Sequence, residues 1–159
     1  MESGTVAPPR LRPATPEDEQ FLRAVYAATR ADELALVQWS VEQKRAFTDM
    51  QFAAQDADYK RNYPAAQYSI IEVQGIPAGR LYVDRCEKEI RIIDIALLPE
   101  HRRSGIGTKL LRALQDEARA AGKTLTIHVE KFNPARSLYD RLGFQQVEDK
   151  GVYLFLEWK

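Results

Sequence analysis

The sequence has little cysteine, little histidine, no net charge and no long apolar run. Its single cysteine, Cys86, among 159 residues excludes an intrachain disulfide framework and a cysteine-rich zinc module, and fits a reducing, cytoplasmic compartment. With 23 basic and 23 acidic residues the formal charge is zero, so nucleic-acid binding through a strong positive field is not expected. No apolar segment approaches the roughly 18 residues of a membrane-spanning helix. We therefore expect a globular protein without a metal, a nucleic-acid partner or a membrane anchor.

One domain accounts for the length. A chain of 159 residues fits a single domain of about 100–200 residues with a full hydrophobic core. Residues 1–9 are small, include two prolines and show no periodicity, which predicts a mobile tail before a domain over residues 10–159. They also lack the basic segment and apolar run of a signal peptide.

Hydrophobic periodicity predicts an α/β (α+β) fold. Helices are expected over 16–26, 41–61, 104–121 and 133–142, and strands over 10–14, 68–73, 78–84, 89–98, 124–129, 144–147 and 152–157. Because the segment 89–98 is long and isoleucine-rich, we expect it at the centre of the sheet. The helix over 104–121 and its flanking strands predict a strand–helix–strand crossover, followed by two antiparallel strands.

The segment before the first long strand is the least regular part of the chain. Residues 31–39 are apolar without clear spacing, which predicts no more than a single turn, whereas Ser40 and Gln43 have the form of a capping box. The apolar face of the following helix is expected at Phe47, Met50, Ala54 and Ala57. Its aromatic residues are expected mainly in the core: Trp39, Phe47, Phe52 and Tyr59.

A glycine- and arginine-containing turn follows the predicted central strand. Arg102, Arg103, Gly105 and Gly107 stand where this strand passes into the next helix. Free amides at a helix start attract anions, glycine lets a large anion approach the backbone, and arginine adds charge-assisted hydrogen bonds. The turn therefore predicts a phosphate site, although glycines that only permit the bend are the alternative.

Two common nucleotide motifs are excluded here. A Walker loop needs a Lys-Ser/Thr ending, and Thr108-Lys109 has the reverse order. A dinucleotide fingerprint needs a third glycine, and Leu110 stands in its place.

Arg102-Arg103-Ser104-Gly105-Ile106-Gly107 resembles the pyrophosphate-binding signature of the GCN5-related N-acetyltransferases (GNAT), Arg/Gln-x-x-Gly-x-Gly/Ala. A second segment, from Asn133-Pro134-Ala135 through Leu138-Tyr139 to Gly143-Phe144, resembles another landmark of the family. Asn133 stands one residue closer to the alanine than is common there, so either the loop is one residue tighter or the strand register shifts.

The resemblance implies the GNAT fold and acetyl-coenzyme A as co-substrate. It implies a mixed, mostly antiparallel sheet of about six to seven strands with about four helices, splayed between two parallel central strands. Strand backbone at Ile95–Leu97 would pair with the pantetheine arm, and the amides from Arg103 to Thr108 would hold the pyrophosphate. The full set of implied cofactor-binding residues is Ile95, Ala96, Leu97, Arg102, Arg103, Ser104, Gly105, Ile106, Gly107, Thr108 and Asn133.

Three side chains are candidates for proton transfer. Tyr139 aligns with the tyrosine that gives a proton to the departing thiolate in such enzymes, its alternative being a packed core ring. His128 lies where some relatives carry a glutamate base, and its ordinary pKa near 6.5 suits that role, the alternative being a hydrogen-bonded strand histidine. Asp94, a carboxylate in an apolar strand, is the rival base, or else a structural partner for Arg91 or a helix end.

These residues predict an N-acetyltransferase that transfers an acetyl group from acetyl-CoA to a primary amine, on a small molecule or a peptide N-terminus. The amine would attack directly in a ternary complex. The alternative is a non-catalytic acyl-CoA-binding or sensor domain of the same fold, and a nucleotide-phosphate binder is a weaker one. A homodimer is compatible with the resemblance, and the acceptor is expected to be encoded between Ala31 and Pro64.

Overall fold

The computed structural model describes residues 7–159, and the first six residues of the predicted tail lie outside that part. The strands are β1 (Arg10–Pro13), β2 (Gln67–Val73), β3 (Ile76–Arg85), β4 (Glu89–Leu97), β5 (Thr124–Glu130), β6 (Gln145–Asp149) and β7 (Tyr153–Trp158). The α-helices are α1 (Glu19–Leu34), α2 (Val41–Asn62), α3 (Ile106–Ala121) and α4 (Arg136–Arg141). Within residues 7–159, no helix is both long and apolar enough to cross a bilayer.

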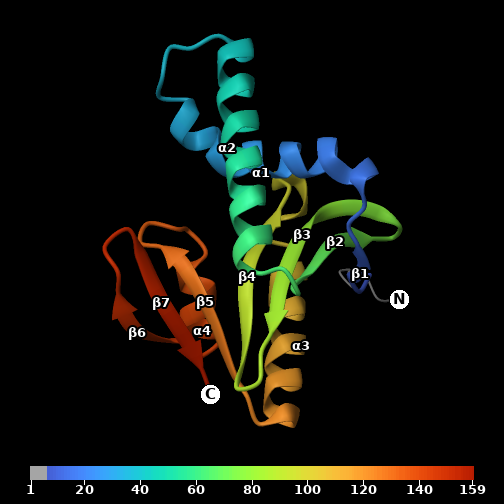
Figure 1. Ribbon diagram of the computed structural model, residues 1–159, viewed down its shortest axis with the longest axis vertical. Helices are drawn as coiled ribbons and strands as arrows, with labels where there is room; N and C mark the ends of the chain where they lie inside the picture. The colour runs from blue at the N-terminus through green and yellow to red at the C-terminus, as the bar shows by residue number, and fades with distance from the viewer. Residues whose placement is uncertain (1–6) are drawn as a thin grey trace.

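The strands form one mixed sheet in the order β1-β2-β3-β4-β5-β7-β6 (Figure 1). Of the pairings between described strands, β4 with β5 is parallel and all the others are antiparallel. The central position of β4 and the crossover through α3 confirm the predicted topology. The antiparallel pairing of β6 with β7 is confirmed as well.

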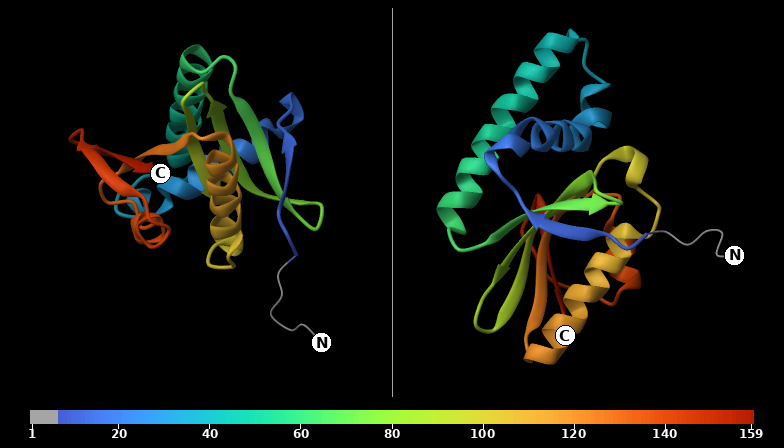
Figure 2. Two further views of the ribbon diagram at one scale, coloured as in Figure 1. Left: turned by 90° about the horizontal axis from the view of Figure 1, so that it is seen from below. Right: turned by 90° about the vertical axis from the view of Figure 1, so that its right-hand side faces the viewer.

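Helices cover both faces of the sheet. Helices α1 and α2 lie on one face, while α3 and α4 lie on the other (Figure 2). The larger core lies on the α3 side, where Leu111, Leu125 and Ile92 are almost completely buried. A smaller cluster, Leu22, Tyr26, Phe52 and Ile70, lies on the α1 side. The sheet therefore lies between two layers of helices, with the larger apolar core on one face and the smaller cluster on the other.

Helix α2 begins as its sequence predicts. Ser40 accepts a hydrogen bond from the Gln43 amide, and the Gln43 side chain accepts one from the Ser40 amide, which completes the capping box. The predicted apolar face is wrong, because Met50 is 62% exposed whereas Thr48 and Phe52 are buried. The first half of α2 extends beyond the sheet (Figure 1), so only α1 is available to cover it.

Helix α1 is longer than the predicted 16–26. Its α-helical part starts at Glu19, after a 3-10 turn over Pro16–Asp18, and continues to Leu34. The expectation of an irregular segment from Ala31 is therefore wrong for its first four residues. Packing of α1 against α2 extends the helix beyond the region where its own spacing is regular.

A partly buried carboxylate ties β1 to the start of α1. Asp18 accepts two hydrogen bonds from Arg12, at 2.8 and 2.9 Å, and one from the Thr15 amide at 2.8 Å. The side-chain hydrogen bonds from Arg12 lower the pKa of Asp18 well below its usual range, and burial only partly opposes them. The ionised carboxylate therefore stabilises the folded state.

Replacement of Asp18 by asparagine should lower the free energy of unfolding at pH 7 by about 1–3 kcal/mol, because hydrogen bonds to a charged group are lost. A carboxylate whose pKa is lowered by folding stabilises the folded state at pH values above its unfolded-state pKa, about 3.9. This stabilisation is lost as the pH falls toward the folded-state pKa. Urea unfolding from pH 7 to pH 2 should thus show the difference between Asp18→Asn and wild type shrinking below about pH 4. A difference that is constant with pH would contradict this assignment.

Candidate functional site

The two parallel strands separate at the centre of the sheet. Pairing between β4 and β5 runs from Glu89 opposite Thr124 to Ile92 opposite Ile127 and then ends. The register of β4 against β3 shifts at the same place, between the pairs Tyr82–Asp94 and Val83–Ile92. An extra residue in one strand bends it and increases its twist, which explains why β4 diverges from β5 after Ile92. The splay implied by the resemblance is confirmed.

The C-terminal part of β4 forms one side of this splay. Ile95, Ala96 and Leu97 pair with β3 along one edge, and no β5 residue pairs with the other edge. Their second backbone edge is thus open to a strand-like ligand. Arg102 donates from Nε to the Leu97 carbonyl at 3.0 Å, which holds the following turn against the end of β4.

Helix α3 starts beside the open end of the splay. Gly105 is its N-cap and has φ = 83°, a left-handed conformation that glycine adopts without a Cβ penalty. The first helical hydrogen bond is donated by the Lys109 amide to the Gly105 carbonyl, so the preceding amides have no partner within the helix. A Cβ at Gly105 would meet no atom within 4 Å, so the glycine is required here by its backbone conformation and not by lack of space.

The other predicted cofactor residues have local roles in this turn. Arg103 has φ = 61°, the Ser104 hydroxyl donates to the His101 carbonyl at 2.7 Å, and Arg102 and Arg103 are both exposed. The turn therefore brings two cations to a helix start, as the sequence predicts. Asn133 lies in the β5–α4 loop, where Oδ1 accepts from the Ala135 amide at 2.8 Å.

Tyr139 of α4 lies in the larger core. Its ring packs edge-to-face on Phe144 at 5.6 Å and is 3% exposed. Its hydroxyl forms no hydrogen bond with a described residue. Burial and the negative charge of Asp94 raise the pKa of Tyr139 far above its usual value, so the phenol stays protonated.

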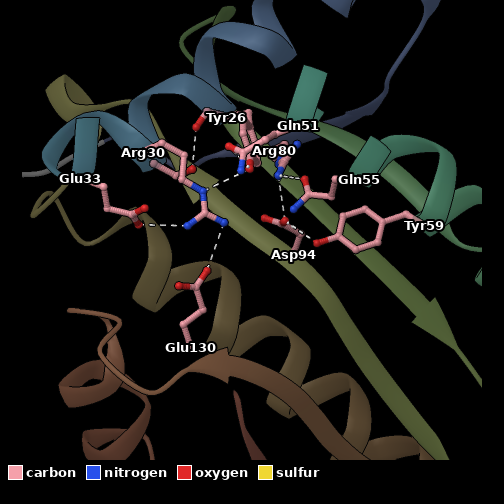
Figure 3. A network of polar contacts seen from close by, with 10 residues as sticks. Tyr26, Arg30, Glu33, Gln51, Gln55, Tyr59, Arg80, Asp94 and Glu130 are labelled. Atoms are coloured by element: carbon pink, nitrogen blue, oxygen red, sulfur yellow. Dashed lines mark hydrogen bonds and ion pairs between the residues drawn. The ribbon is translucent and has the colours of Figure 1, made fainter. Parts of the chain in front are cut away.

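Asp94 lies on the opposite face, in the network of Figure 3. Its Oδ2 accepts from the Tyr59 hydroxyl of α2 at 2.9 Å and from Arg80 Nη2 of β3 at 2.8 Å. Arg80 Nη2 also donates to Gln55 Oε1 at 2.9 Å. The expectation that Arg91 is the structural partner of Asp94 is wrong, because Arg91 donates hydrogen bonds to Glu89 and Thr126 instead.

A second ion pair joins the acceptor-side helix α1 to β5. Arg30 contacts Glu130 at 3.3 Å and Glu33 at 3.0 Å, and its Nε donates to the Tyr26 hydroxyl at 3.2 Å (Figure 3). The strands on the two sides of the splay are thus linked separately to helices on the same face: β4 to α2 through Asp94, and β5 to α1 through Glu130.

His128 lies on β5, two residues before Glu130, and packs on the Phe155 ring at 4.7 Å. Its Nε2 is 3.3 Å from Lys150 Nζ. Burial lowers the pKa of His128, and the charges of Arg91 and Lys150 lower it further. Neutral at pH 7, the imidazole accepts from the Lys150 ammonium at Nε2, which leaves the proton on Nδ1.

Two residues that contact Asp94 are missing from the site residues predicted from the sequence. Arg80 is 2% exposed. The feature of the sequence that could have identified it is a lone arginine within an apolar strand. Tyr59 was expected in the core but bonds to Asp94 instead. Among residues 7–159, no cluster of three or more histidine, cysteine, aspartate or glutamate side chains could hold a metal ion.

Comparisons with known proteins agree with this geometry. The Acetyltransferase (GNAT) family matches residues 24–144. Over 66 residues the chain is 35% identical to the ribosomal protein bS18-alanine N-acetyltransferase of Haemophilus influenzae, a stretch that covers 41% of this chain and 45% of that protein. The match therefore spans less than half the length of this curated relative.

Solved structures share the fold across almost the whole chain. PaiA N-acetyltransferase from Thermoplasma acidophilum, solved with coenzyme A, has a TM-score of 0.71 at 16% identity and covers 95% of this chain and 98% of its own. Naa50 from Arabidopsis thaliana, solved with the bisubstrate analogue CoA-Ac-MVNAL, has a TM-score of 0.62 at 16% identity, with 95% and 97% covered.

The family match spans more than half of the chain, and the sheet has the expected splay. This protein belongs to the Acetyltransferase (GNAT) family.

Proposed function

We propose that this protein transfers the acetyl group of acetyl-CoA to a primary amine in a ternary complex. One observation carries the proposal: the splay between β4 and β5 opens beside the unpartnered amides of α3. The phenol of Tyr139 lies on one face of the sheet and the carboxylate of Asp94 on the other. The curated relative and the family match support the same chemistry.

The chain's residues fit the co-substrate in two parts. The amides from Arg103 to Thr108, with the Arg102 and Arg103 side chains, would bind the pyrophosphate, since a helix start favours negative charge. The open edge of β4 at Ile95–Leu97 would pair with the pantetheine arm. Asn133, which caps the turn before α4, would contribute to coenzyme A binding through the conformation of its loop.

The reaction removes two protons from the acceptor nitrogen and supplies one to sulfur. The acceptor ammonium loses a proton to a base, its nitrogen lone pair forms the new C–N bond with the acetyl carbon, the C–S bond breaks, and the nitrogen then loses its second proton to solvent. Tyr139 would give its proton to the departing sulfur, whose thiol pKa lies near 8.5, and would regain one from solvent. The balance is an N-acetylated amine, a free thiol and one proton released.

The base is either Asp94 or His128. The Nε2 of His128 faces the Lys150 ammonium, whereas Oδ1 of Asp94 has no described partner. We therefore expect Asp94→Asn to lower kcat/KM for the amine at least 100-fold, a typical loss for a general base, and His128→Gln to lower it less than about threefold. Steady-state kinetics of both variants at pH 7.5 check this, and the reverse order would return the role to His128.

The acceptor is a primary amine on a small molecule or on a peptide N-terminus. The curated relative is named for an alanine N-terminus, and the analogue in the Naa50 structure carries the peptide MVNAL. These names support a test of N-terminal peptides beside simple amines. A cytoplasmic location, the absence of a metal and a homodimer stay predictions.

Two measurements test the proposed function. Acetyl-CoA should raise the melting temperature, since a ligand at 100 times its Kd adds about 2.7 kcal/mol to the folded state, and ATP at equal concentration should do little. A larger shift with ATP would contradict acyl-CoA binding. Thiol release should then follow addition of propylamine, lysine or an alanine-initiated peptide; binding of acetyl-CoA without release to any amine would support the sensor alternative.

A further inference from the structure

The polar contacts around Asp94 leave one of its oxygens free. Both hydrogen bonds, from Tyr59 and from Arg80, go to Oδ2. No described residue bonds to Oδ1, and the Asp94 side chain retains 16% exposure. Two donors on a single oxygen restrain the carboxylate and leave Oδ1 available to a ligand.

Stability alone is a poor explanation for this arrangement. Arg80 is almost completely buried, and its Nε has no hydrogen-bond partner. A buried ion pair often contributes less than apolar residues of the same size, and an unsatisfied buried donor costs free energy. The pair is therefore better explained by what it holds in place than by the energy of the contact itself.

Helix α2 supplies a matching row of polar side chains. Gln51, Gln55 and Tyr59 are spaced four residues apart, so they share one face of the helix. They bond to Tyr26, Arg80 and Asp94 respectively. Gln51 is directed to α1, and Gln55 and Tyr59 to the sheet, where an amphipathic helix would place apolar residues. The row connects α2 directly to the carboxylate.

We propose that Tyr59 and Arg80 are positioning residues that hold Asp94 through Oδ2, so that its free Oδ1 binds the ammonium group of the acceptor. The inference rests on the proposed function and extends it to the acceptor side. It assigns the C-terminal half of α2 a part in amine recognition that acts through Asp94. Because the group held by Tyr59 and Arg80 (the clamp) is a carboxylate, the recognised group is a cation, here the ammonium form of the amine.

Tyr59→Phe tests the clamp, with Tyr63→Phe as its matched control. Tyr63 follows one helical turn later, and its hydroxyl forms no hydrogen bond with a described residue. Removing one of two charge-assisted donors should lower kcat/KM for propylamine about tenfold, chiefly through KM. KM for acetyl-CoA should stay close to that of Tyr63→Phe, whereas the melting temperature should be lower for Tyr59→Phe, because only Tyr59 loses a hydrogen bond to a charged group.

The double variant separates positioning from a general structural role. If Tyr59 acts through Asp94, then Tyr59→Phe added to Asp94→Asn should cause no further loss, because the two effects are not independent. Additive losses, or equal kinetics for Tyr59→Phe and Tyr63→Phe, would overturn the inference while acetyl transfer by the wild type stands. Failure of the wild type to acetylate any amine would refute the proposed function and the ammonium-binding role with it. In that case, the clamp is tested by urea unfolding: additive effects of Tyr59→Phe and Asp94→Asn on the free energy of unfolding would refute it as well.

Discussion

Replacement of Gly105 by valine should abolish measurable binding of acetyl-CoA, with Kd raised at least 100-fold. At φ = 83° a side chain is strained by about 1–2 kcal/mol, and a β-branched one by more. The strain would be relieved by a change in the turn, which would move the amides that start α3. Isothermal titration calorimetry with acetyl-CoA measures the loss.

Gly122→Val is the matched control, because Gly122 ends the same helix. It has φ = 68°, and a Cβ there would also meet no atom within 4 Å. The two substitutions should therefore lower stability by similar amounts, while only the first affects binding. Equal Kd values for the two variants would show that the start of α3 does not bind the cofactor.

Tyr139→Phe should lower kcat by about 10²–10⁴-fold and leave Kd for acetyl-CoA nearly unchanged. Phenylalanine preserves the packing on Phe144 and removes only the hydroxyl, which has no partner among the described residues. Tyr63→Phe is again the control. Full activity of Tyr139→Phe across the pH range would refute the proton-donor assignment.

The pH profile gives an independent check of this donor. A proton donor loses activity as the pH rises through its pKa, and burial together with Asp94 raises the pKa of Tyr139. Wild-type kcat should therefore show no fall attributable to Tyr139 at or below the ordinary tyrosine value of about 10. Asp94→Asn removes one cause of the raised pKa, so its residual kcat should fall at a lower pH than that of the wild type.

Much of the fold was predictable because its signals are local. Ser40 and Gln43 form the predicted capping box, Gly122 ends α3 in a left-handed conformation, and the isoleucine-rich segment is the central strand. Each of these follows from backbone hydrogen bonding or periodicity over a few residues. The turn before α3 was equally readable, since its glycines and arginines are close together in the sequence.

The acceptor side was not predictable in the same way. Apolar spacing does not predict the polar row of α2. Gln55 and Tyr59 face the sheet because they bond to partners 25 and 35 residues away in the sequence. Met50 was expected in the core, but the first half of α2 extends past the sheet. Which side chains a helix buries depends on what lies opposite, and periodicity does not contain that information.

By itself the sequence determined a neutral domain with one cysteine, the order of its strands and helices, and a helix start suited to a pyrophosphate. Those features depend on residues close together in the chain. Tertiary structure alone decided that Asp94 is held by Tyr59 and Arg80 rather than by Arg91, and that Lys150 faces His128. Such contacts join strands and helices far apart in sequence, so they exist only once the sheet has brought β3, β4, β5 and α2 together.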